Sequence, residues 1–297
     1  MPKPTNQKIL YAYVNGKITP ADKAVVSVFD RGIVLGDGLF ETLRAVDRHP
    51  QFFHFHYRRL EKSARRLRIA LEMDEKALRD LVQNLCRKSK LEDAVVRITL
   101  TRGLYQGGLA IDKTISPSLI VTVAPVSGLP PELYAKGVKV AISTINKAAA
   151  SGLDSTIKSI NYLANIFAKA QADQKGCYEA ILLGPQGEIA ELSTSSFFCV
   201  MGNEILTPPL GTGILPGITR QVLLRMLKRE RITHREAPLF PKQIPKMSEA
   251  FLCSSVRGPL AIHSIDGQKI GDGKVGSVYL RIRDMYDAEC ARDLAAA

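Results

Sequence analysis

Three groups that could take part in one reaction follow each other along the second half of this 297-residue chain. Lys158 lies in the run Ile157–Asn165, the carboxylate Glu191 comes next, and a glycine-rich turn opens a helix at Gly213–Arg220. An amine can form a Schiff base with an aldehyde, and an acid can hold the proton on a pyridine nitrogen. The N–H groups at the start of a helix can hold a phosphate. The order of these groups therefore predicts pyridoxal 5′-phosphate as the cofactor.

Each of these groups also has an ordinary structural explanation. Most lysines are only surface charge, and the hydroxyl run Ser193–Ser196 after Glu191 is typical of a turn at the end of a strand. We predict a helix over Ser159–Lys175, whose polar face would place two amides and Tyr162 beside Lys158. These polar but uncharged neighbours favour a lysine that lines a binding site over a lysine on a solvent-exposed helix face.

The composition is that of a globular protein, with 45% hydrophobic and 24% charged residues. No apolar run approaches the roughly 18 residues of a transmembrane helix, so we expect no membrane partner. Residues 1–8 lack the apolar core of a signal peptide. The five cysteines are scattered, without paired spacing, and fit a reduced, cytoplasmic protein without a metal site.

The net charge of +12 raises the question of a nucleic-acid partner. The basic residues cluster at Arg58–Arg68 and Lys228–Arg231, in helix-like segments with regularly spaced leucines. The chain contains no tryptophan, and no stretch interleaves aromatic with basic residues as base stacking requires. We therefore expect basic helix faces and no nucleic acid, with a charge that would attract an anionic substrate and a phosphorylated cofactor.

The mixed order of predicted strands and helices favours an α+β fold. Strands are expected at Leu39–Val46 and Ala94–Thr101, and helices at Phe55–Leu71 and Asp74–Leu91. A stretch rich in proline, glycine and serine then interrupts the pattern, which is typical of a connector. The predicted organisation is a small N-terminal domain over residues 1–125, a linker over 126–137 and a larger domain over 138–297.

Seven short stretches spread over most of the chain carry a more specific signal. They are Asp30–Gly32, Gly36–Glu41, His56–Leu60, Lys158–Leu163, Gly176–Ala180, Glu191–Phe198 and Leu215–Arg220. Together they resemble the class IV, fold-type IV pyridoxal-phosphate enzymes, which include branched-chain aminotransferases, D-amino-acid aminotransferases and aminodeoxychorismate lyases. The resemblance implies a small N-terminal α/β sandwich, a larger C-terminal pseudo-barrel α/β domain holding the cofactor, and a homodimer.

The resemblance also implies roles for individual residues. Lys158 would be the Schiff-base lysine and general base, Glu191 would pair with the ring nitrogen, and Tyr162 would lie near the ring hydroxyl. The other residues implied at the phosphate and the ring are Arg59, Ser195, Leu215, Ile218, Thr219, Ser254 and Ser255. Arg59 suits this role chemically, because a guanidinium can bind phosphate through two parallel hydrogen bonds.

The substrate half of the site matches no single subfamily. The carboxylate clamp of D-amino-acid aminotransferases falls on Phe40, Gly107 and Leu109, so that clamp is absent. Apolar residues at the substrate positions favour a substrate with an alkyl side chain, because burying each CH₂ contributes ~0.8 kcal/mol. Arg97 matches the arginine that branched-chain enzymes use for the distal carboxylate of glutamate. The substrate residues that we expect are Phe40, Arg97, Val256 and Arg257.

The expected activity is transamination between an amino acid, foremost an L-branched-chain one, and a 2-oxo acid such as 2-oxoglutarate. Two alternatives stay open, a D-amino-acid aminotransferase and an aminodeoxychorismate lyase. The motif stretches Asp30–Gly32 and Gly176–Ala180 read closer to the D-amino-acid branch. Retention of Glu41 and Tyr162 favours a transaminase over the lyase.

Overall fold

The structure, a computed structural model, describes residues 10–112, 114–146 and 154–296. The N-terminal residues whose composition argued against a signal peptide lie outside this range. The described residues form two compact units. Unit 1 contains residues 10–127, Ile157–Asn161 and 292–296, and unit 2 contains the described residues between Gly128 and Thr156 and those from Tyr162 to Ala291.

The predicted domain boundaries stay a prediction, but residues 292–296 and two other segments differ from what the sequence suggested. The helix α4 (Pro131–Lys136) lies within the predicted linker. The segment Ile157–Asn161 was expected in the larger domain, whereas it belongs to unit 1. Lys158 is therefore positioned by the unit that precedes it in the chain.

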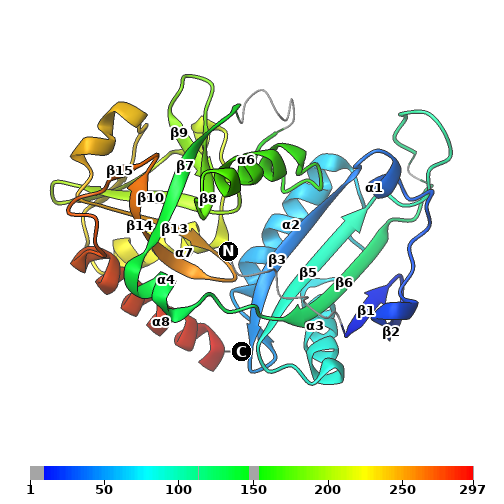
Figure 1. The fold of residues 1–297 in the computed structure, drawn as a ribbon. Helices are drawn as coiled ribbons and strands as arrows, with labels where there is room; N and C mark the ends of the chain where they lie inside the picture. The colour runs from blue at the N-terminus through cyan, green and yellow to red at the C-terminus, as the bar shows by residue number, and fades with distance from the viewer. Residues whose placement is uncertain (1–9, 113, 147–153, 297) are drawn as a thin grey trace. The chain divides into compact units, whose positions relative to one another are not determined.

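Unit 1 is built on a six-stranded antiparallel sheet in the order β2-β1-β6-β5-β3-β4. Its strands are β1 (Tyr11–Val14), β2 (Lys17–Pro20), β3 (Gly38–Val46), β4 (His49–Pro50), β5 (Ala94–Thr101) and β6 (Ser118–Pro125). Its helices are α1 (Arg31–Val34), α2 (Phe53–Leu67) and α3 (Glu75–Ser89), after a 3₁₀ turn at Ala21–Lys23. Figure 1 shows α2 and α3 lying along the sheet.

Alternation along β3 determines which side chains meet the helices. Leu39, Leu43 and Ala45 are buried in the core that α2 and α3 complete, and a strand sends successive side chains to opposite faces. Phe40 and Glu41 therefore point to different sides of the sheet. The helix α2 ends earlier than predicted, because Arg68 takes a left-handed conformation (φ 55°) that closes it.

Unit 2 is built on a nine-stranded mixed sheet in the order β12-β11-β10-β13-β14-β7-β8-β9, with β15 paired to β14. Its strands are β7 (Val138–Asn146), β8 (Glu179–Leu183), β9 (Ile189–Leu192), β10 (Ser196–Met201), β11 (Glu204–Thr207), β12 (His234–Glu236), β13 (Glu249–Ser254), β14 (Gly258–Ile265) and β15 (Gln268–Lys269). The longer helices are α6 (Leu163–Gln174), α7 (Ile218–Arg229) and α8 (Ser277–Ala295), and 3₁₀ turns occur at Leu210–Thr212 and Pro241–Lys246. Within the part of the chain that the structure describes, no helix has the length and hydrophobicity needed to cross a membrane.

The helix predicted over Ser159–Lys175 is wrong at its start, since α6 begins only at Leu163. The residues before it pair with the open edge of β3. The Phe40 N–H donates to the Lys158 carbonyl (2.9 Å), and the Ile160 N–H donates to the Gly38 carbonyl (3.1 Å). This pairing satisfies backbone groups that a helix would otherwise have used, so tertiary context overrides the local helical pattern.

Candidate active site

Lys158 is positioned by the edge of β3 rather than by a helix face. A bridge between Leu39 and Ser159 places Phe40 opposite Lys158, and residues directly opposite in a ladder project to the same face. The Lys158 ammonium consequently lies over the Phe40 ring, 4.6 Å from its centroid. A backbone pairing thus holds the reactive amine at a set place on one face of the sheet.

Arg97 joins Phe40 and Lys158 on that face. On the neighbouring strand β5 it pairs with Thr42, one step diagonally from Phe40, and its guanidinium lies 3.8 Å from the centre of the Phe40 ring. Phe40 is 5% exposed, and the side chain of Arg97 lies on the exposed side of β5. Unit 1 thus brings together three of the predicted residues as an amine, an aromatic surface and a guanidinium.

Arg59 lies on the opposite face, in a fully buried cluster with Glu41 and His56. The Arg59 Nε and Nη2 atoms donate to the two Glu41 oxygens, both at 2.7 Å. His56 Nδ1 lies 2.7 Å from Glu41 Oε2. Burial alone raises the pKa of Glu41, but the charge and hydrogen bonds of Arg59 and the hydrogen bond of His56 outweigh it and lower the pKa to about 2. Burial lowers the pKa of His56, so Glu41 is ionised and His56 is neutral.

Glu191 lies in β9 of unit 2, one residue before its end, and is 7% exposed. Its Oε2 accepts the Leu215 N–H at 3.0 Å, which ties the predicted acid to the loop before α7. Ile218 and Thr219 are buried and Leu215 is half-buried, as we expect of residues that line a binding site. The sequence order of acid and turn therefore corresponds to a direct contact in the fold.

The start of α7 has the features of an anion cradle. Gly217 occupies the N-cap and provides no side-chain cap, which leaves the first turn of the helix without a competing side-chain oxygen. A Cβ on Gly217 would lie 2.6 Å from the Ser196 hydroxyl, so a larger residue would force the Ser196 side chain to move. Thr219 adds a buried hydroxyl at the same turn, hydrogen-bonded to Tyr286, whose pKa burial raises.

The hydroxyl run after Glu191 serves a buried acid that the sequence analysis missed. Glu179 accepts hydrogen bonds from the hydroxyls of Ser193 (3.3 Å), Thr194 (2.6 Å) and Ser195 (2.9 Å), and from the Thr194 N–H (3.1 Å). The predicted cofactor role of Ser195 stays a prediction, but its hydroxyl donates to Glu179. The position of Glu179 inside the stretch Gly176–Ala180 was the only signal that could have pointed to it.

Three predicted residues form the turn between β13 and β14. Ser254 pairs with Gly258, so Ser255, Val256 and Arg257 make the connection. Gly258 is left-handed (φ 66°), and a Cβ there would lie 2.9 Å from the Tyr286 ring, as a tight hairpin against a packed ring requires. The roles of Ser254, Ser255 and Val256 stay predictions that this arrangement does not test.

Arg257 is turned towards an aromatic side chain. Its guanidinium carbon lies 5.6 Å from the centre of the Tyr178 ring, and its carbonyl accepts the Tyr134 hydroxyl at 3.2 Å. Burial raises the pKa of Tyr178, which keeps that hydroxyl protonated. The expected contact of Arg257 with the substrate stays a prediction.

Tyr162 lies at the N-cap of α6 and not on its polar face. Leu163, Ile166 and Phe167 are 64%, 60% and 56% exposed. The buried residues of α6 are the small side chains Ala168 and Ala172.

The motif residues Asp30, Arg31 and Asp37 build a scaffold. The Asp37 carboxylate accepts hydrogen bonds from Arg31 (2.9 Å) and from Arg102 (2.7 and 3.0 Å). Burial raises the pKa of Asp37, but the hydrogen bonds from Arg102 and Arg31 outweigh it and lower the pKa. Arg31 Nη1 also donates to the Gly108 carbonyl at 3.4 Å. This motif therefore holds the loops around β3 and β5 and does not itself present reactive groups.

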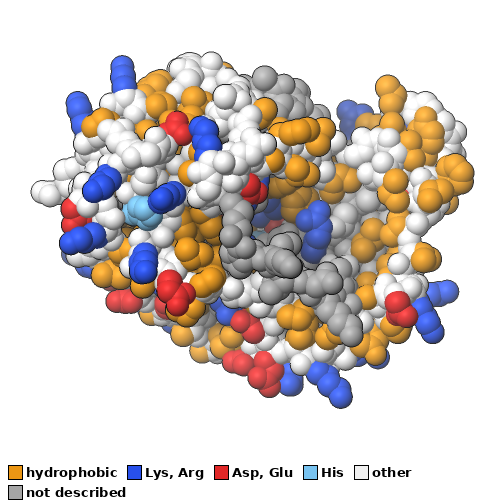
Figure 2. Space-filling model, in the orientation of Figure 1, with side chains coloured by type: hydrophobic (Ala, Val, Ile, Leu, Met, Phe, Trp, Pro, Cys, Tyr) orange, Lys and Arg blue, Asp and Glu red, His pale blue; other side chains and the backbone are white. Residues whose placement is uncertain are grey.

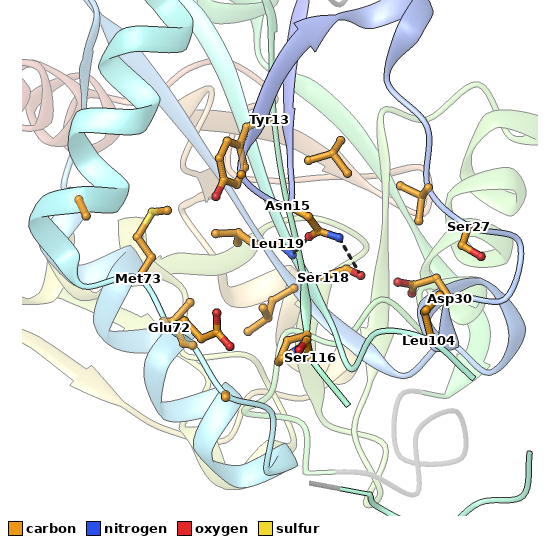
Figure 3. Close-up of a pocket in the computed structure, with 18 of the residues that line it drawn as sticks. Tyr13, Asn15, Ser27, Asp30, Glu72, Met73, Leu104, Ser116, Ser118 and Leu119 are labelled. Carbon is orange, nitrogen blue, oxygen red and sulfur yellow. Dashed lines mark hydrogen bonds between the residues drawn. The ribbon is translucent and has the colours of Figure 1, made fainter. Parts of the chain in front are cut away.

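A pocket of about 780 Å³ lies in unit 1, where Asp30 is one of its lining residues. Figure 3 shows Asn15, Glu72, Met73 and Leu119 among its lining side chains, with a hydrogen bond from Asn15 to Ser118. None of the predicted site residues lines it. The predicted chemistry therefore lies outside this pocket.

Comparison with known proteins decides the family. The family model for class IV aminotransferases matches residues 38–265. The chain belongs to the class IV aminotransferase family. This enzyme is 32% identical over 274 residues to a Methanocaldococcus jannaschii protein whose name provisionally assigns it as a branched-chain-amino-acid aminotransferase, covering 92% of this chain and 94% of that one.

Solved structures agree with the family. The crystal structure of the Escherichia coli branched-chain amino acid aminotransferase matches this aminotransferase with a TM-score of 0.88 and 26% identity, covering 95% of this chain and 94% of that one. The 4-amino-4-deoxychorismate lyase of Pseudomonas aeruginosa matches with a TM-score of 0.79 and 27% identity, covering 92% and 97%. The predicted α+β, fold-type IV architecture and the predicted family are confirmed.

The enzyme is a transaminase that uses pyridoxal 5′-phosphate, as class IV aminotransferases do. Its own residues fit that cofactor. The N-cap of α7 is a glycine without a side-chain cap, and a Cβ there would lie 2.6 Å from the Ser196 hydroxyl. Lys158 offers an amine beside an aromatic ring, and Arg59 offers a guanidinium held in one orientation. The helix N–H groups and the guanidinium can donate hydrogen bonds to a phosphate. The amine can form a Schiff base with an aldehyde.

Proposed function

We propose that this aminotransferase exchanges the amino group between an L-branched-chain amino acid and 2-oxoglutarate. The observation that carries the proposal is the packing of Phe40 against both Lys158 and Arg97. An aromatic surface beside the amine suits an alkyl side chain, while the guanidinium suits the distal carboxylate of the acidic partner. The relatives named as branched-chain aminotransferases support the same substrate class.

The chain's own residues would divide the work as follows. Pyridoxal phosphate, when bound, supplies the aldehyde that takes up the amino group and the ring that accepts electrons. Lys158 Nζ would take the proton from the substrate α-carbon as a general base and give it up again as a general acid. Glu191 would keep a proton on the ring nitrogen. Arg59 would bind the phosphate, and so would the N–H groups of Ile218 and Thr219.

Two alternatives from the same family can be separated from this proposal by substrate. A D-amino-acid aminotransferase would prefer the opposite hand, and an aminodeoxychorismate lyase would release pyruvate. The lyase of known structure shares the fold at 27% identity. The relatives named as branched-chain aminotransferases favour the transaminase.

A screen of amino donors tests the substrate. The wild-type enzyme is mixed with paired L- and D-amino acids, and conversion of the bound cofactor to its amine form is followed by absorbance. We expect L-leucine, L-isoleucine and L-valine to react faster than D-alanine or D-glutamate. Faster conversion by D-alanine would refute the assignment, and pyruvate release from aminodeoxychorismate without any amine transfer would support the lyase.

The same screen on Arg97→Met separates the two substrates. We expect turnover with glutamate to fall by about 10²-fold, since a lost charged hydrogen bond costs about 1.5–3 kcal/mol. Turnover with L-leucine should stay within about twofold of the wild type. Arg44→Met is the matched control, because Arg44 lies on β3 and pairs with Asp93 at 2.7 Å. Equal losses for both substrates with Arg97→Met would remove Arg97 from the acceptor site.

We also propose that the enzyme works as a homodimer in the cytoplasm. In unit 1, large hydrophobic side chains gather around α1 and the loop after β5, where Val25, Val28, Phe29 and Leu109 are 78%, 70%, 64% and 78% exposed. Figure 2 shows hydrophobic side chains gathered at the right of the view, over the end of unit 1 that carries α1. Contiguous apolar surface of this kind marks interaction sites. The five free thiols suit a reducing compartment.

Light scattering tests the dimer. The wild-type enzyme should have the mass of two chains at micromolar concentration, whereas Val28→Asp with Phe29→Asp should have the mass of one. Each buried valine or phenylalanine contributes about 1.5–3 kcal/mol, so a charge at both positions should weaken association by several orders of magnitude. Leu280→Asp, an exposed leucine on α8, is the control. A wild-type monomer would contradict the proposal.

A further inference from the structure

We propose that Glu41 and His56 are positioning residues for the cofactor phosphate, acting through Arg59. The inference rests on the proposed role of Arg59 as a phosphate ligand. The three side chains form one buried cluster, in which Glu41 stands between the other two. Glu41 and His56 would contact neither cofactor nor substrate, and their effect would be felt only where Arg59 meets the phosphate.

The geometry of the Glu41–Arg59 pair fixes the direction of the guanidinium. The carboxylate engages the edge that carries Nε and Nη2 in two parallel bonds of 2.7 Å. A planar guanidinium held along this edge can no longer rotate about its terminal bonds, and its Nη1 end is directed away from Glu41. The donor groups for phosphate are thereby arranged before the cofactor arrives, which reduces the entropy lost on binding.

His56 fixes the carboxylate in turn. An ionised Glu41 only accepts hydrogen bonds, so the Nδ1 atom of the neutral His56, 2.7 Å from Oε2, must carry the proton. Oε2 accepts from His56 and from Arg59 at once. All three side chains are at most 8% exposed, so water does not compete for these bonds.

The cluster is more than a requirement for stability of the core. A buried ion pair could be replaced by apolar side chains with little loss of stability, so packing alone does not explain a carboxylate here. Glu41 follows Phe40 on β3, which pairs with Lys158. The same strand therefore positions both the amine of Lys158 and the guanidinium of Arg59.

The test compares two ligands that differ only in the phosphate. Enzyme stripped of cofactor is titrated with pyridoxal 5′-phosphate and with pyridoxal. In Glu41→Gln, the amide nitrogen would face a donor of Arg59 or His56, so the guanidinium should lose its fixed direction. We expect the dissociation constant for pyridoxal 5′-phosphate to rise about tenfold or more. The dissociation constant for pyridoxal should stay unchanged, and the ³¹P signal of the bound phosphate should shift.

Two further variants guard against misfolding. Asp37→Asn breaks a comparable cluster in the same unit, between Arg31 and Arg102, and should lower the melting temperature without changing the ratio of the two dissociation constants. His56→Gln keeps the Glu41–Arg59 pair and should weaken phosphate binding in the same direction by a smaller factor. If Glu41→Gln does not fold, Glu41→Asp decides by the same ratio, since the shorter acid cannot reach Arg59 through both oxygens.

The outcomes separate this inference from the proposed function. If Arg59→Gln leaves the preference for the phosphorylated ligand intact, the proposed role of Arg59 fails. If Arg59→Gln removes that preference but Glu41→Gln does not, only the positioning role is overturned. Equal weakening of both ligands by Glu41→Gln would likewise overturn it, because a general loss of structure does not discriminate between them.

Discussion

Replacing Lys158 with alanine should reduce the turnover of any amino donor by about 10⁴-fold or more, because no other group moves the substrate α-proton. The backbone of Lys158 carries the pairing with Phe40, so alanine should leave the fold unchanged. Single-turnover absorbance with L-leucine measures the effect. Borohydride treatment of the wild-type holoenzyme, followed by peptide mass spectrometry, should place the cofactor on Lys158.

Lys169→Ala is the matched control for this change. Lys169 is a lysine of α6 whose ammonium pairs with Asp173, and it has no proposed part in the reaction. Its turnover should stay within about twofold of the wild type, as is usual for surface substitutions. Normal turnover in Lys158→Ala, or cofactor attached by borohydride to Lys169, would contradict the assignment of Lys158.

Glu191→Gln should lower the maximal rate by on the order of 10²- to 10³-fold, the usual effect of removing one preorganised electrostatic group. A neutral amide cannot keep the ring nitrogen protonated, so the developing negative charge would lose its main stabilisation. Cofactor affinity should change far less, since the phosphate contacts remain. Steady-state kinetics with L-leucine and 2-oxoglutarate, together with a cofactor titration, separates these two effects.

Glu188→Gln is the control for Glu191, because Glu188 is a buried acid of the same hairpin. Its Oε2 accepts the Gln186 N–H at 2.7 Å, which is a turn contact. We expect it to reduce stability and to leave the rate per folded enzyme unchanged. Equal rate losses in both variants would mean that Glu191 acts through the hairpin and not on the cofactor.

The sequence alone was sufficient to predict the family, the reaction class and the cofactor. Each of three groups lies within a short sequence motif: Lys158, Glu191 and the turn before α7. Their order along the chain is therefore visible without a structure. The contact of Leu215 with Glu191 agrees with that order. Alternating patterns also predicted strands such as β5 over Ala94–Thr101, because a strand with one buried face repeats every second residue.

Only the tertiary structure decided how Lys158 is held. The local pattern after it is helical, yet Ser159 and Ile160 pair with the open edge of β3. An unpaired strand edge offers backbone donors and acceptors that no local pattern reveals, and here it displaced the start of α6 to Leu163.

The buried acids were likewise beyond the sequence. Nothing in its spacing distinguishes Arg59 from the other arginines of its basic helix. The spacing of Glu41 and Glu179 likewise gives no sign of their buried partners. Their roles depend on partners far away in the chain, such as the hydroxyls that surround Glu179 and the helix that brings Arg59 to Glu41. A charge enters a core only where such partners compensate its lost hydration, and that compensation exists only once the chain has folded.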